Sequence, residues 1–380
     1  MSFVVTLASA RGAGTVGGKA ASLGELTRAG VAVPPGFAVS VEGFTAAMDA
    51  LDPGGALRAE VSRLDAADLA GIAAAGARLR ALVGGAELPA EVAAAVTAAY
   101  AALGGGPGAY GDSGGSGDLA EGADVAVRSS ATVEDSADAS FAGLQDTYLG
   151  IRGAPAVLEH VARCWASLFN DESLTYRRRL GMDEAGVAMA VVVQTMVAPR
   201  AAGVLFTRSP VTGDRSVVAI EGTWGLGSGL VSGDVTPDSW VISKITGEIT
   251  TRRVSPKIKT HRYVPNGFGF SPSHAAVSLP GDGVVIAETP AELRDAPCLT
   301  DDEIRALAAT ACRVEAHYGR PQDIEWAVLD GESAPDGRIV LLQSRPETVW
   351  AARETGPAGA PRARAADHVL ALFGKQTRWT

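Results

Sequence analysis

The sequence predicts a mixed α/β fold divided into two or three structural units. A strand, a glycine turn, a helix and a second strand follow one another between Val4 and Val41. An Ala-rich stretch at 43–103 is helical in character, and the second half of the chain is rich in β-type segments. The chain has 380 residues, of which 47% are hydrophobic. It can therefore bury a substantial core, and its length fits domains of roughly 100–200 residues.

The first strand–helix–strand unit is defined by its turns. Gly17-Gly18-Lys19 opens a segment in which Leu23 and Leu26 have helical spacing, and Pro34-Pro35-Gly36 stops that helix before the strand FAVSV. The Ala-rich stretch that follows predicts two or three helices. It ends in the low-complexity segment Gly104–Gly122, which predicts a loop or linker.

The middle of the chain combines strands with one long helix. Strands are predicted around Val125–Arg128 and Asp146–Ile151, and a helix is predicted from about Ala154 to Leu180. Further β-rich segments follow, namely AMAVVVQTMV, VLFTRS, SVVAIE and SWVISK.

The last third of the sequence predicts a helix and a hairpin. Thr300 with Glu303 forms a capping box, which predicts a helix from there to Tyr318. The strands DIEWAVLD and RIVLLQSRP bracket a nine-residue connection, Asp330–Arg338. Beyond Trp350 the composition becomes Ala-, Pro- and Arg-rich, which predicts a tail at 351–380 with one short helix.

The charge and the cysteines limit the classes of function. A net charge of −10 argues against a general nucleic-acid or anionic-membrane binder, because such partners require clustered Lys and Arg. The cysteines, Cys164, Cys298 and Cys312, are too widely spaced for a disulfide framework or a zinc site, which indicates a reducing compartment. The sequence shows no signal-peptide pattern and no apolar run of about 18 residues. We therefore expect a soluble, cytoplasmic protein.

The glycines near the N-terminus predict an anion site, although two familiar phosphate motifs do not fit. Gly12, Gly14 and Gly17 match G-x-G-x-x-G, but the acidic residue needed about 20 residues further on is missing. A Walker A loop fails because Ala20 replaces its Ser or Thr. Lys19 remains at a helix start, where free N–H groups favour an anion and a lysine can reach a phosphate. An ordinary turn with a solvated lysine is the alternative.

The two C-terminal strands predict a magnesium and phosphate site. With a side-chain period of two, each strand has one face that carries its polar residues. These faces comprise Asp323, Glu325 and Ala327 on the first strand, and Ile339, Leu341, Gln343 and Arg345 on the second. If the strands pair antiparallel, Glu325 and Gln343 offer oxygen ligands for Mg²⁺, and Arg345 can clamp a phosphate. The alternative is a hairpin with a structural Glu–Arg pair.

The stretch AVRSSATVEDSADASFAG (126–143) places an arginine at the head of a run of hydroxyl groups. Arg128 ends a strand, and Gly143 would allow a backbone to approach a ligand closely. The hydroxyl groups nearby belong to Ser129, Ser130, Thr132, Ser140 and Thr147. Such a loop is suited to covering phosphates. A purely structural polar turn is the alternative.

Five motifs along the chain resemble the nucleotide-binding part of the phosphoenolpyruvate synthase, pyruvate phosphate dikinase and rifampin phosphotransferase family. The motifs are GGKAASLGEL with VPPGFAVS (17–40), VAVRSSATVEDSADASFAGLQDTYL (125–149), VVVQTMVAPRAAGVLFTRSPVTGD (191–214), WGLGSGLVSGDVTPDSW (224–240), and GRPQDIEWAV with LLQSRPETVW (319–350). The resemblance implies an ATP-grasp fold with ATP between two α/β lobes. These lobes would cover 1–193, including the Gly-rich loop 104–122, and 194–350.

The resemblance also implies roles for individual residues. Lys19, Arg128 and Arg345 resemble the family's catalytic, phosphate-binding cations, and Glu325 and Gln343 resemble its magnesium ligands. Two further groups correspond to the hinge that meets adenine and to the phosphate-covering loop. They comprise Gln194, Met196 and Val197 for the hinge, and Ser140, Gly143 and Thr147 for the loop.

The implied function is that of the ATP-using part of a dikinase-type phosphotransferase. ATP would be converted to AMP and phosphate while a phosphoryl group passes to a histidine on a swivelling domain, and from there to a small-molecule substrate. We expect that domain to be a partner subunit or part of a longer chain. Ser228 replaces a glutamate that is common in the family after Gly-Leu-Gly. A self-contained small-molecule kinase or ligase and a non-catalytic nucleotide-binding regulatory module stay open as alternatives.

Overall fold

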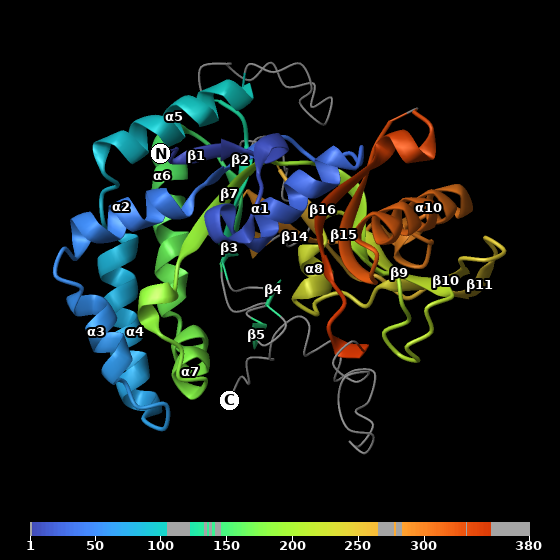
Figure 1. Cartoon of the computed structure of the whole chain (residues 1–380). Helices are drawn as coiled ribbons and strands as arrows, with labels where there is room; N and C mark the ends of the chain where they lie inside the picture. Colours follow the sequence, from blue (N-terminus) through green and yellow to red (C-terminus); the bar gives the residue numbers. More distant parts are fainter. Residues whose placement is uncertain are drawn as a thin grey trace. The chain divides into compact units, whose positions relative to one another are not determined.

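The computed structural model describes residues 2–104, 122–132, 135–136, 139–140, 146–264, 277–278, 283–331 and 333–350. Two compact units divide the chain. Met1–Glu25 and Pro35–Met196 form unit 1, and Leu26–Pro34 and Val197–Thr380 form unit 2. Both units combine helices with an antiparallel sheet (Figure 1), so the mixed α/β prediction is confirmed.

Unit 1 is built on a five-stranded sheet with strand order β1-β2-β7-β3-β6. All four neighbouring pairs are antiparallel. The strands are β1 (Val4–Thr6), β2 (Gly36–Val39), β3 (Val125–Ala131), β6 (Thr147–Ile151) and β7 (Met189–Thr195), and a small separate ribbon pairs β4 (Asp135–Ser136) with β5 (Ala139–Ser140).

The helices of unit 1 are more numerous than the sequence predicted. They are α1 (Ala13–Arg28), α2 (Val41–Leu51), α3 (Ala56–Arg63), α4 (Leu69–Gly84), α5 (Ala90–Gly104), α6 (Ala154–Ala166) and α7 (Asp171–Arg179), with the short 3₁₀ turns η1 (Leu7–Ser9), η3 (Ser167–Phe169) and η4 (Glu184–Gly186). The prediction of two or three helices in 43–103 is therefore wrong. Side-chain caps create the extra boundaries, because Asp52 accepts the first N–H groups of α3 and Asp68 caps α4.

The helix predicted from Ala154 to Leu180 is also interrupted. It ends as α6, passes through η3, and restarts as α7 after Asn170, whose backbone is extended (φ −62°, ψ 147°). An extended residue cannot continue the helical hydrogen-bond ladder, so the segment turns at this point. Composition alone does not reveal such a turn.

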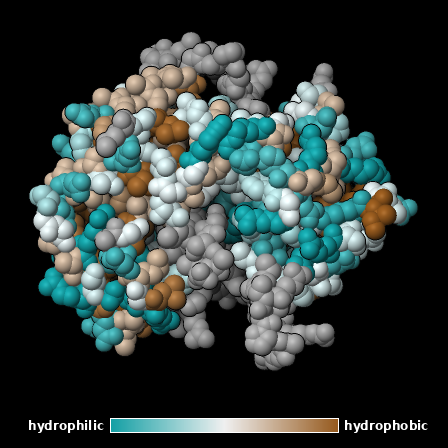
Figure 2. All heavy atoms as spheres, in the orientation of Figure 1, coloured by the Kyte–Doolittle hydropathy of each residue, from teal (hydrophilic) through white to brown (hydrophobic). Residues whose placement is uncertain are grey.

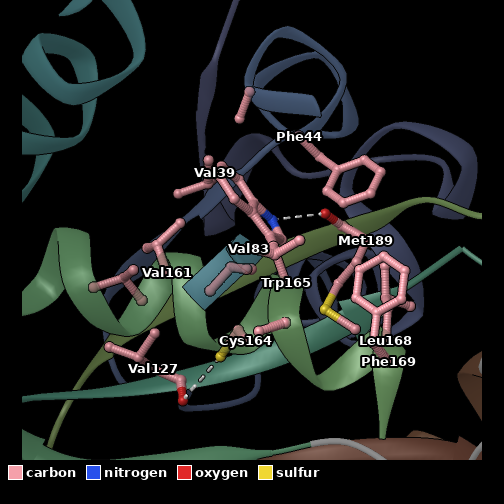
Figure 3. Close-up of a cluster of buried hydrophobic side chains, with 14 of the residues drawn as sticks. Val39, Phe44, Val83, Val127, Val161, Cys164, Trp165, Leu168, Phe169 and Met189 are labelled. Carbon is pink, nitrogen blue, oxygen red and sulfur yellow. Dashed lines mark hydrogen bonds between the residues drawn. The ribbon is translucent and has the colours of Figure 1, made fainter. Parts of the chain in front are cut away.

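The core of unit 1 lies between the sheet and the helices α2, α4, α5 and α6. Trp165 is at its centre: it meets Phe44 edge to face, with ring centroids 5.8 Å apart, and its indole Nε1 donates to the carbonyl oxygen of Met189 at 3.0 Å (Figure 3). Val125 and Val127 of β3 face this cluster. By strand alternation, Arg128 and Ser130 point to the opposite face of the sheet.

Unit 2 contains a six-stranded sheet with strand order β11-β10-β9-β8-β15-β16 and a three-stranded sheet with order β12-β14-β13. The strands are β8 (Pro199–Phe206), β9 (Val217–Trp224), β10 (Asp238–Ser243), β11 (Ile249–Arg253), β12 (Lys259–Tyr263), β13 (Val277–Ser278), β14 (Val284–Glu288), β15 (Gln322–Leu329) and β16 (Ile339–Pro346). The helical elements are α8 (Ser228–Val231), α9 (Ala291–Arg294), α10 (Asp301–Tyr318) and the 3₁₀ turn η6 (Pro335–Arg338).

Helix α10 contacts β9, β10 and β15 and begins as the sequence predicted. Thr300 accepts from the N–H of Glu303, and the Glu303 carboxylate accepts from the N–H of Thr300 at 2.9 Å, so the capping box is confirmed. The predicted antiparallel pairing of the last two strands is confirmed as well. Trp240 and Trp326 are fully buried in the core of this unit.

The surface contains scattered apolar residues. The large exposed hydrophobic side chains among the described residues are Leu69, Leu82, Leu180, Val211, Val231, Ile245, Val254 and Ile258, which lie on many different elements. Figure 2 shows hydrophobic residues in small groups within a largely hydrophilic and neutral face. Of the helices in the described part of the chain, none has the length and hydropathy needed to cross a membrane.

Candidate functional site

In unit 2, the hairpin of β15 and β16 places four polar residues opposite one another. Glu325 pairs directly with Gln343, and Asp323 pairs with Arg345. Directly opposed residues of an antiparallel pair project to the same side of the sheet. The Nε of Arg345 lies 3.6 Å from Oδ2 of Asp323. The predicted convergence of a carboxylate, an amide and a guanidinium on one hairpin face is therefore confirmed.

A register shift changes which apolar residues accompany these groups. Glu325 pairs with Gln343, but the next residue, Trp326, pairs with Leu341, so Leu342 is an extra residue in β16. A bulge of this kind reverses the side on which the following residues project. The prediction that Ile339 and Leu341 share a face with Gln343 is therefore wrong. The bulge directs Leu341 into the core and leaves Gln343 on the polar face.

The polar face extends across the sheet. Val204 of β8 pairs with both Glu325 and Glu221 of β9, so the row Glu221–Val204–Glu325–Gln343 crosses four strands. Burial raises the pKa of the Glu221 carboxyl. The sequence analysis did not select Glu221. Strand alternation nevertheless places its side chain on the face opposite to that of its buried neighbour Ile220.

A small pocket lies on this face. Val204, Phe206, Asp323, Ile324, Glu325, Gln343 and Arg345 line it, and its volume is about 10 Å³. This is about the space of one water molecule, so the pocket has the size of an ion site and not of a whole nucleotide.

The carboxyl group of Asp323 is shifted strongly by its surroundings. Burial raises its pKa to about 7, and the neighbouring Glu347 acts in the same direction, whereas Arg345 opposes the shift. Its Oδ1 is buried and has no hydrogen-bond partner among the described residues. A buried oxygen of this kind can be satisfied by a proton, a water molecule or a bound cation.

The donor set of the pocket fits Mg²⁺. Two carboxylates and an amide oxygen are hard oxygen ligands, and Mg²⁺ commonly binds one or two carboxylates together with substrate phosphates. No group of three or more His, Cys, Asp or Glu side chains suited to a metal occurs in the described part of the chain. A magnesium ion at Glu325 and Gln343 would therefore draw its remaining ligands from a phosphate or from water, and Asp323 lines the same pocket.

In unit 1, the helix that carries Lys19 is fixed to strand β3. Gly17 interrupts α1 with φ 75° and ψ 167°, so the regular helix begins after it, as the sequence predicted. The hydroxyl of Ser130 accepts from the N–H of Ala20 at 3.2 Å and donates to the carbonyl oxygen of Val16 at 3.0 Å. Lys19 follows directly after this turn and is half-buried. These contacts tie the Lys19 turn to the strand that carries Arg128.

Arg128 and Thr147 lie opposite one another on β3 and β6. Arg128 is 9% exposed, whereas Thr147 is exposed at the end of its strand. The other predicted hydroxyl groups have different roles. Ser130 anchors α1, Thr132 donates to the carbonyl oxygen of Ala188, and Ser129 is buried on the core side of β3.

The predicted hinge residues lie where the chain leaves unit 1. Gln194 is a buried residue of β7 paired with Ala126, and the N–H of Met196 donates to the carbonyl oxygen of Asp124 at 2.9 Å. Met196 is the last residue of unit 1 and Val197 the first of the following segment of unit 2. Of the predicted loop residues, Gly143 lies outside the described residues, and Ser140 is described only as part of strand β5.

The loop in which Ser228 replaces the expected glutamate has its own polar contacts. The Ser228 hydroxyl lies 3.0 Å from Nδ1 of His261, and Nε2 of His261 lies 3.4 Å from a carboxylate oxygen of Asp234. Burial lowers the pKa of His261, and Asp234 partly offsets this effect. The sequence analysis did not find this contact, because His261 is 33 residues away along the chain.

Comparison with known proteins identifies the family. Residues 13–365 match the model of the pyruvate phosphate dikinase AMP/ATP-binding domain. The chain belongs to this family. The resemblance found in the motifs is therefore confirmed, and with it the assignment of an ATP-binding domain.

Eight relatives of the dikinase domain have between 36% and 44% sequence identity to this chain. A rifampicin phosphotransferase from a Streptomyces species is 44% identical over 342 residues, which cover 89% of this chain and 35% of the relative. A probable phosphoenolpyruvate synthase from Methanothermobacter thermautotrophicus is 39% identical over 88% of this chain and 44% of the relative. The phosphoenolpyruvate synthase of Escherichia coli is 38% identical over 340 residues, which cover 88% of this chain and 40% of the relative. The chain thus spans less than half the length of these relatives.

Proposed function

We propose that this dikinase domain binds ATP with Mg²⁺ and carries out the ATP-using half of a dikinase-type phosphotransfer. ATP would yield AMP and phosphate, and one phosphoryl group would pass to a histidine supplied by another domain or subunit. A small molecule would be the final acceptor. The domain would act in the cytoplasm.

The pairing of Glu325 with Gln343 is the observation that supports this proposal most directly. It puts a carboxylate and an amide side by side on one sheet face, in a pocket that Asp323 also lines. Arg345 lies beside them and can hold a phosphate oxygen while the ion neutralises charge. Mg²⁺ would lower the repulsion between the triphosphate and the groups that approach it.

Unit 1 would supply the remaining phosphate contacts. Lys19 sits directly after the Gly17 turn, and Arg128 lies on the strand to which that turn is anchored. We propose that the cations of unit 1 and the polar hairpin residues of unit 2 bind the same nucleotide, as the two lobes of an ATP-grasp fold do. The segment Gln194–Val197 would then meet the adenine, and Thr147, Ser140 and Gly143 would cover the phosphates.

The contribution of these residues to catalysis is positioning and charge stabilisation. Phosphoryl transfer requires little covalent chemistry from the protein, because the main demands are an in-line geometry and compensation of the phosphate charge. The guanidinium groups of Arg128 and Arg345 and the ammonium group of Lys19 meet the second demand. The nucleophile for the transferred group is a histidine that the proposal places outside this chain.

Binding and turnover assays test the proposal in two steps. In a titration of the chain with ATP, Mg²⁺ should raise the affinity, and Glu325→Ala should abolish most of this gain. Glu248→Ala, which removes an exposed carboxylate in the β10–β11 turn of the same unit, is the matched control and should keep it. An unchanged response to Mg²⁺ in Glu325→Ala would refute the metal assignment.

For turnover, a separately produced histidine-bearing domain from a relative is added to the chain with ATP and Mg²⁺. AMP and phosphate should form only when that domain is present and its histidine is intact. Rapid ADP release by the chain alone would reject the dikinase chemistry in favour of a self-contained kinase. Tight ATP binding without turnover in any mixture would favour a regulatory module.

A further inference from the structure

Glu221 of β9 lies on the same face of the unit 2 sheet as the proposed magnesium ligands. It pairs with Val204, and Val204 pairs with Glu325, so the two glutamates occupy one row of the sheet with a single strand between them. Side chains in such a row project to the same side. Two strand spacings of about 4.8 Å separate their backbones, which amounts to about 10 Å. Both glutamates therefore border one surface, with the apolar side chain of Val204 between them.

The carboxylate of Glu221 makes no hydrogen bond or ion pair within the described part of the chain. Burial raises the pKa of this carboxyl, and no neighbouring cation or donor offsets the loss of water. Leu230 of α8 packs on Val204 and Ala219, so this helix covers the sheet beside Glu221. The side chain of Glu221 is half-buried, and its oxygens are not enclosed as Oδ1 of Asp323 is. A ligand can therefore reach a carboxylate that has lost part of its water.

The chemistry of this position selects the kind of group that fits it. An ionised carboxylate only accepts hydrogen bonds, so the ligand must supply donors. A phosphate is disfavoured because it carries the same charge. A metal ion is disfavoured because the two residues paired with Glu221, Val204 and Ser239, offer no second carboxylate.

The donors of ATP are the two ribose hydroxyls and the adenine amino group. The hydroxyls belong to the sugar that carries the triphosphate, so they lie nearer to the phosphates than the amino group does. A carboxylate also holds the ribose hydroxyls in dinucleotide-binding folds, where the pairing has the same chemical basis. Hydrogen bonds to a charged acceptor are stronger than those between neutral groups.

We propose that Glu221 accepts hydrogen bonds from the ribose hydroxyls of the bound nucleotide and makes the site selective for ribonucleoside triphosphates. The nucleotide lies across the strands, with its outer phosphates at Glu325 and Gln343 and its sugar beyond Val204. This assignment rests on the proposed function, because it takes the phosphate and magnesium site of the hairpin as its starting point. Glu221 selects the sugar and takes no part in the transfer of the phosphoryl group.

A comparison of ATP with 2′-deoxy-ATP, both with Mg²⁺, tests this assignment by isothermal titration calorimetry. The wild type should bind ATP about tenfold more tightly, because the deoxy sugar leaves the carboxylate with one hydrogen bond fewer. Glu221→Ala should bind both nucleotides with nearly equal affinity. Glu221→Gln keeps one acceptor oxygen and should retain part of the preference. Glu248→Ala, which removes an exposed carboxylate of the same unit, should retain all of it.

The ratio of the two affinities separates this role from a general effect on the site. Both nucleotides carry the same triphosphate, so damage to the phosphate or magnesium contacts lowers both affinities and leaves the ratio unchanged. Equal affinities in the wild type, or a full preference for ATP in Glu221→Ala, would overturn the assignment and leave the proposed function standing. If the wild type binds neither nucleotide in the presence of Mg²⁺, the proposed function fails and the assignment fails with it.

Discussion

Asp323 and Arg345 face each other across β15 and β16, with Nε of Arg345 3.6 Å from Oδ2 of Asp323, yet the pKa of this carboxyl is raised to about 7. Burial disfavours the carboxylate more strongly than the guanidinium favours it, and Glu347 adds a second negative charge. The hairpin therefore holds a carboxyl group that is only partly ionised near neutral pH. An additional positive charge at the site would stabilise its ionised form.

The first prediction concerns the stability of the metal-free protein as a function of pH. In the unfolded chain the Asp323 carboxyl titrates near its ordinary value of about 3.9, whereas in the folded chain it titrates near 7. Between these values the folded state binds a proton that the unfolded state does not, so folding is favoured as the pH falls. Asp323→Asn removes this contribution.

In denaturant titrations with EDTA, the free energy of unfolding of the wild type minus that of Asp323→Asn should increase from pH 7 to pH 4. The increase should amount to at most about 4 kcal/mol, since each pKa unit corresponds to about 1.4 kcal/mol. The difference should level off above about pH 8, where the carboxyl is deprotonated in both the folded and the unfolded state. A difference that does not change between pH 4 and pH 7 would contradict this assignment.

The second prediction concerns Arg128. Arg128→Ala should lower the affinity for Mg–ATP about tenfold or more, because it removes a buried cation proposed to contact the phosphates. Arg163→Ala is the control, since Arg163 forms an exposed pair with Glu159 on α6, on the helical side of the sheet. Isothermal titration calorimetry measures the affinity of both variants for Mg–ATP. If Arg128→Ala folds normally and binds Mg–ATP with unchanged affinity, Arg128 has no role in phosphate binding.

The third prediction concerns the turn before Lys19. Gly17 has φ 75°, and a Cβ at this position would overlap the carbonyl oxygen and the hydroxyl of Ser130. Gly17→Ala should therefore cost about 2–4 kcal/mol in the free energy of unfolding and should weaken ATP binding, because the Lys19 turn must move. Gly14→Ala, where a Cβ meets nothing within 4 Å, should leave both quantities nearly unchanged. Thermal melts and ATP titrations check both outcomes, and equal stability of the two variants would argue against the close packing.

The fourth prediction concerns the buried ion pair of unit 2. Lys257 and Asp238 are fully buried, with Nζ of Lys257 2.6 Å from Oδ1 of Asp238. Lys257→Met should destabilise the protein by about 3–5 kcal/mol, because it leaves a buried carboxylate without its partner. Arg305→Met removes an exposed arginine that pairs with Asp302 on α10, and should cost less than about 1 kcal/mol. Chemical denaturation of both variants measures the contrast, and a similar small loss in both would rule out a stabilising role for the buried pair.

Local sequence patterns were sufficient for elements whose signals lie within a few residues. The capping box at Thr300 and Glu303 fixes the start of α10, and the turn at Gly17 precedes the helix of Lys19, as predicted. The antiparallel hairpin and its pairing of carboxylate, amide and guanidinium also follow from local alternation. Local patterns were insufficient at the extra helix boundaries, where the Asp52 carboxylate caps the start of α3 and the extended backbone of Asn170 separates η3 from α7.

The sequence by itself determined the family, the α/β character and the chemical types at the site, because these depend on residue identity and short-range spacing. Tertiary structure decided which groups meet: Ser130 with the α1 turn, Ser228 with His261, and Arg177 with Glu184. It also placed the bulge at Leu342, which separates Leu341 from Gln343. Most of these features arise from packing between segments distant along the chain, and even the local pair of Arg177 and Glu184 is buried only by the surrounding fold. Burial and register exist only once those segments are folded together.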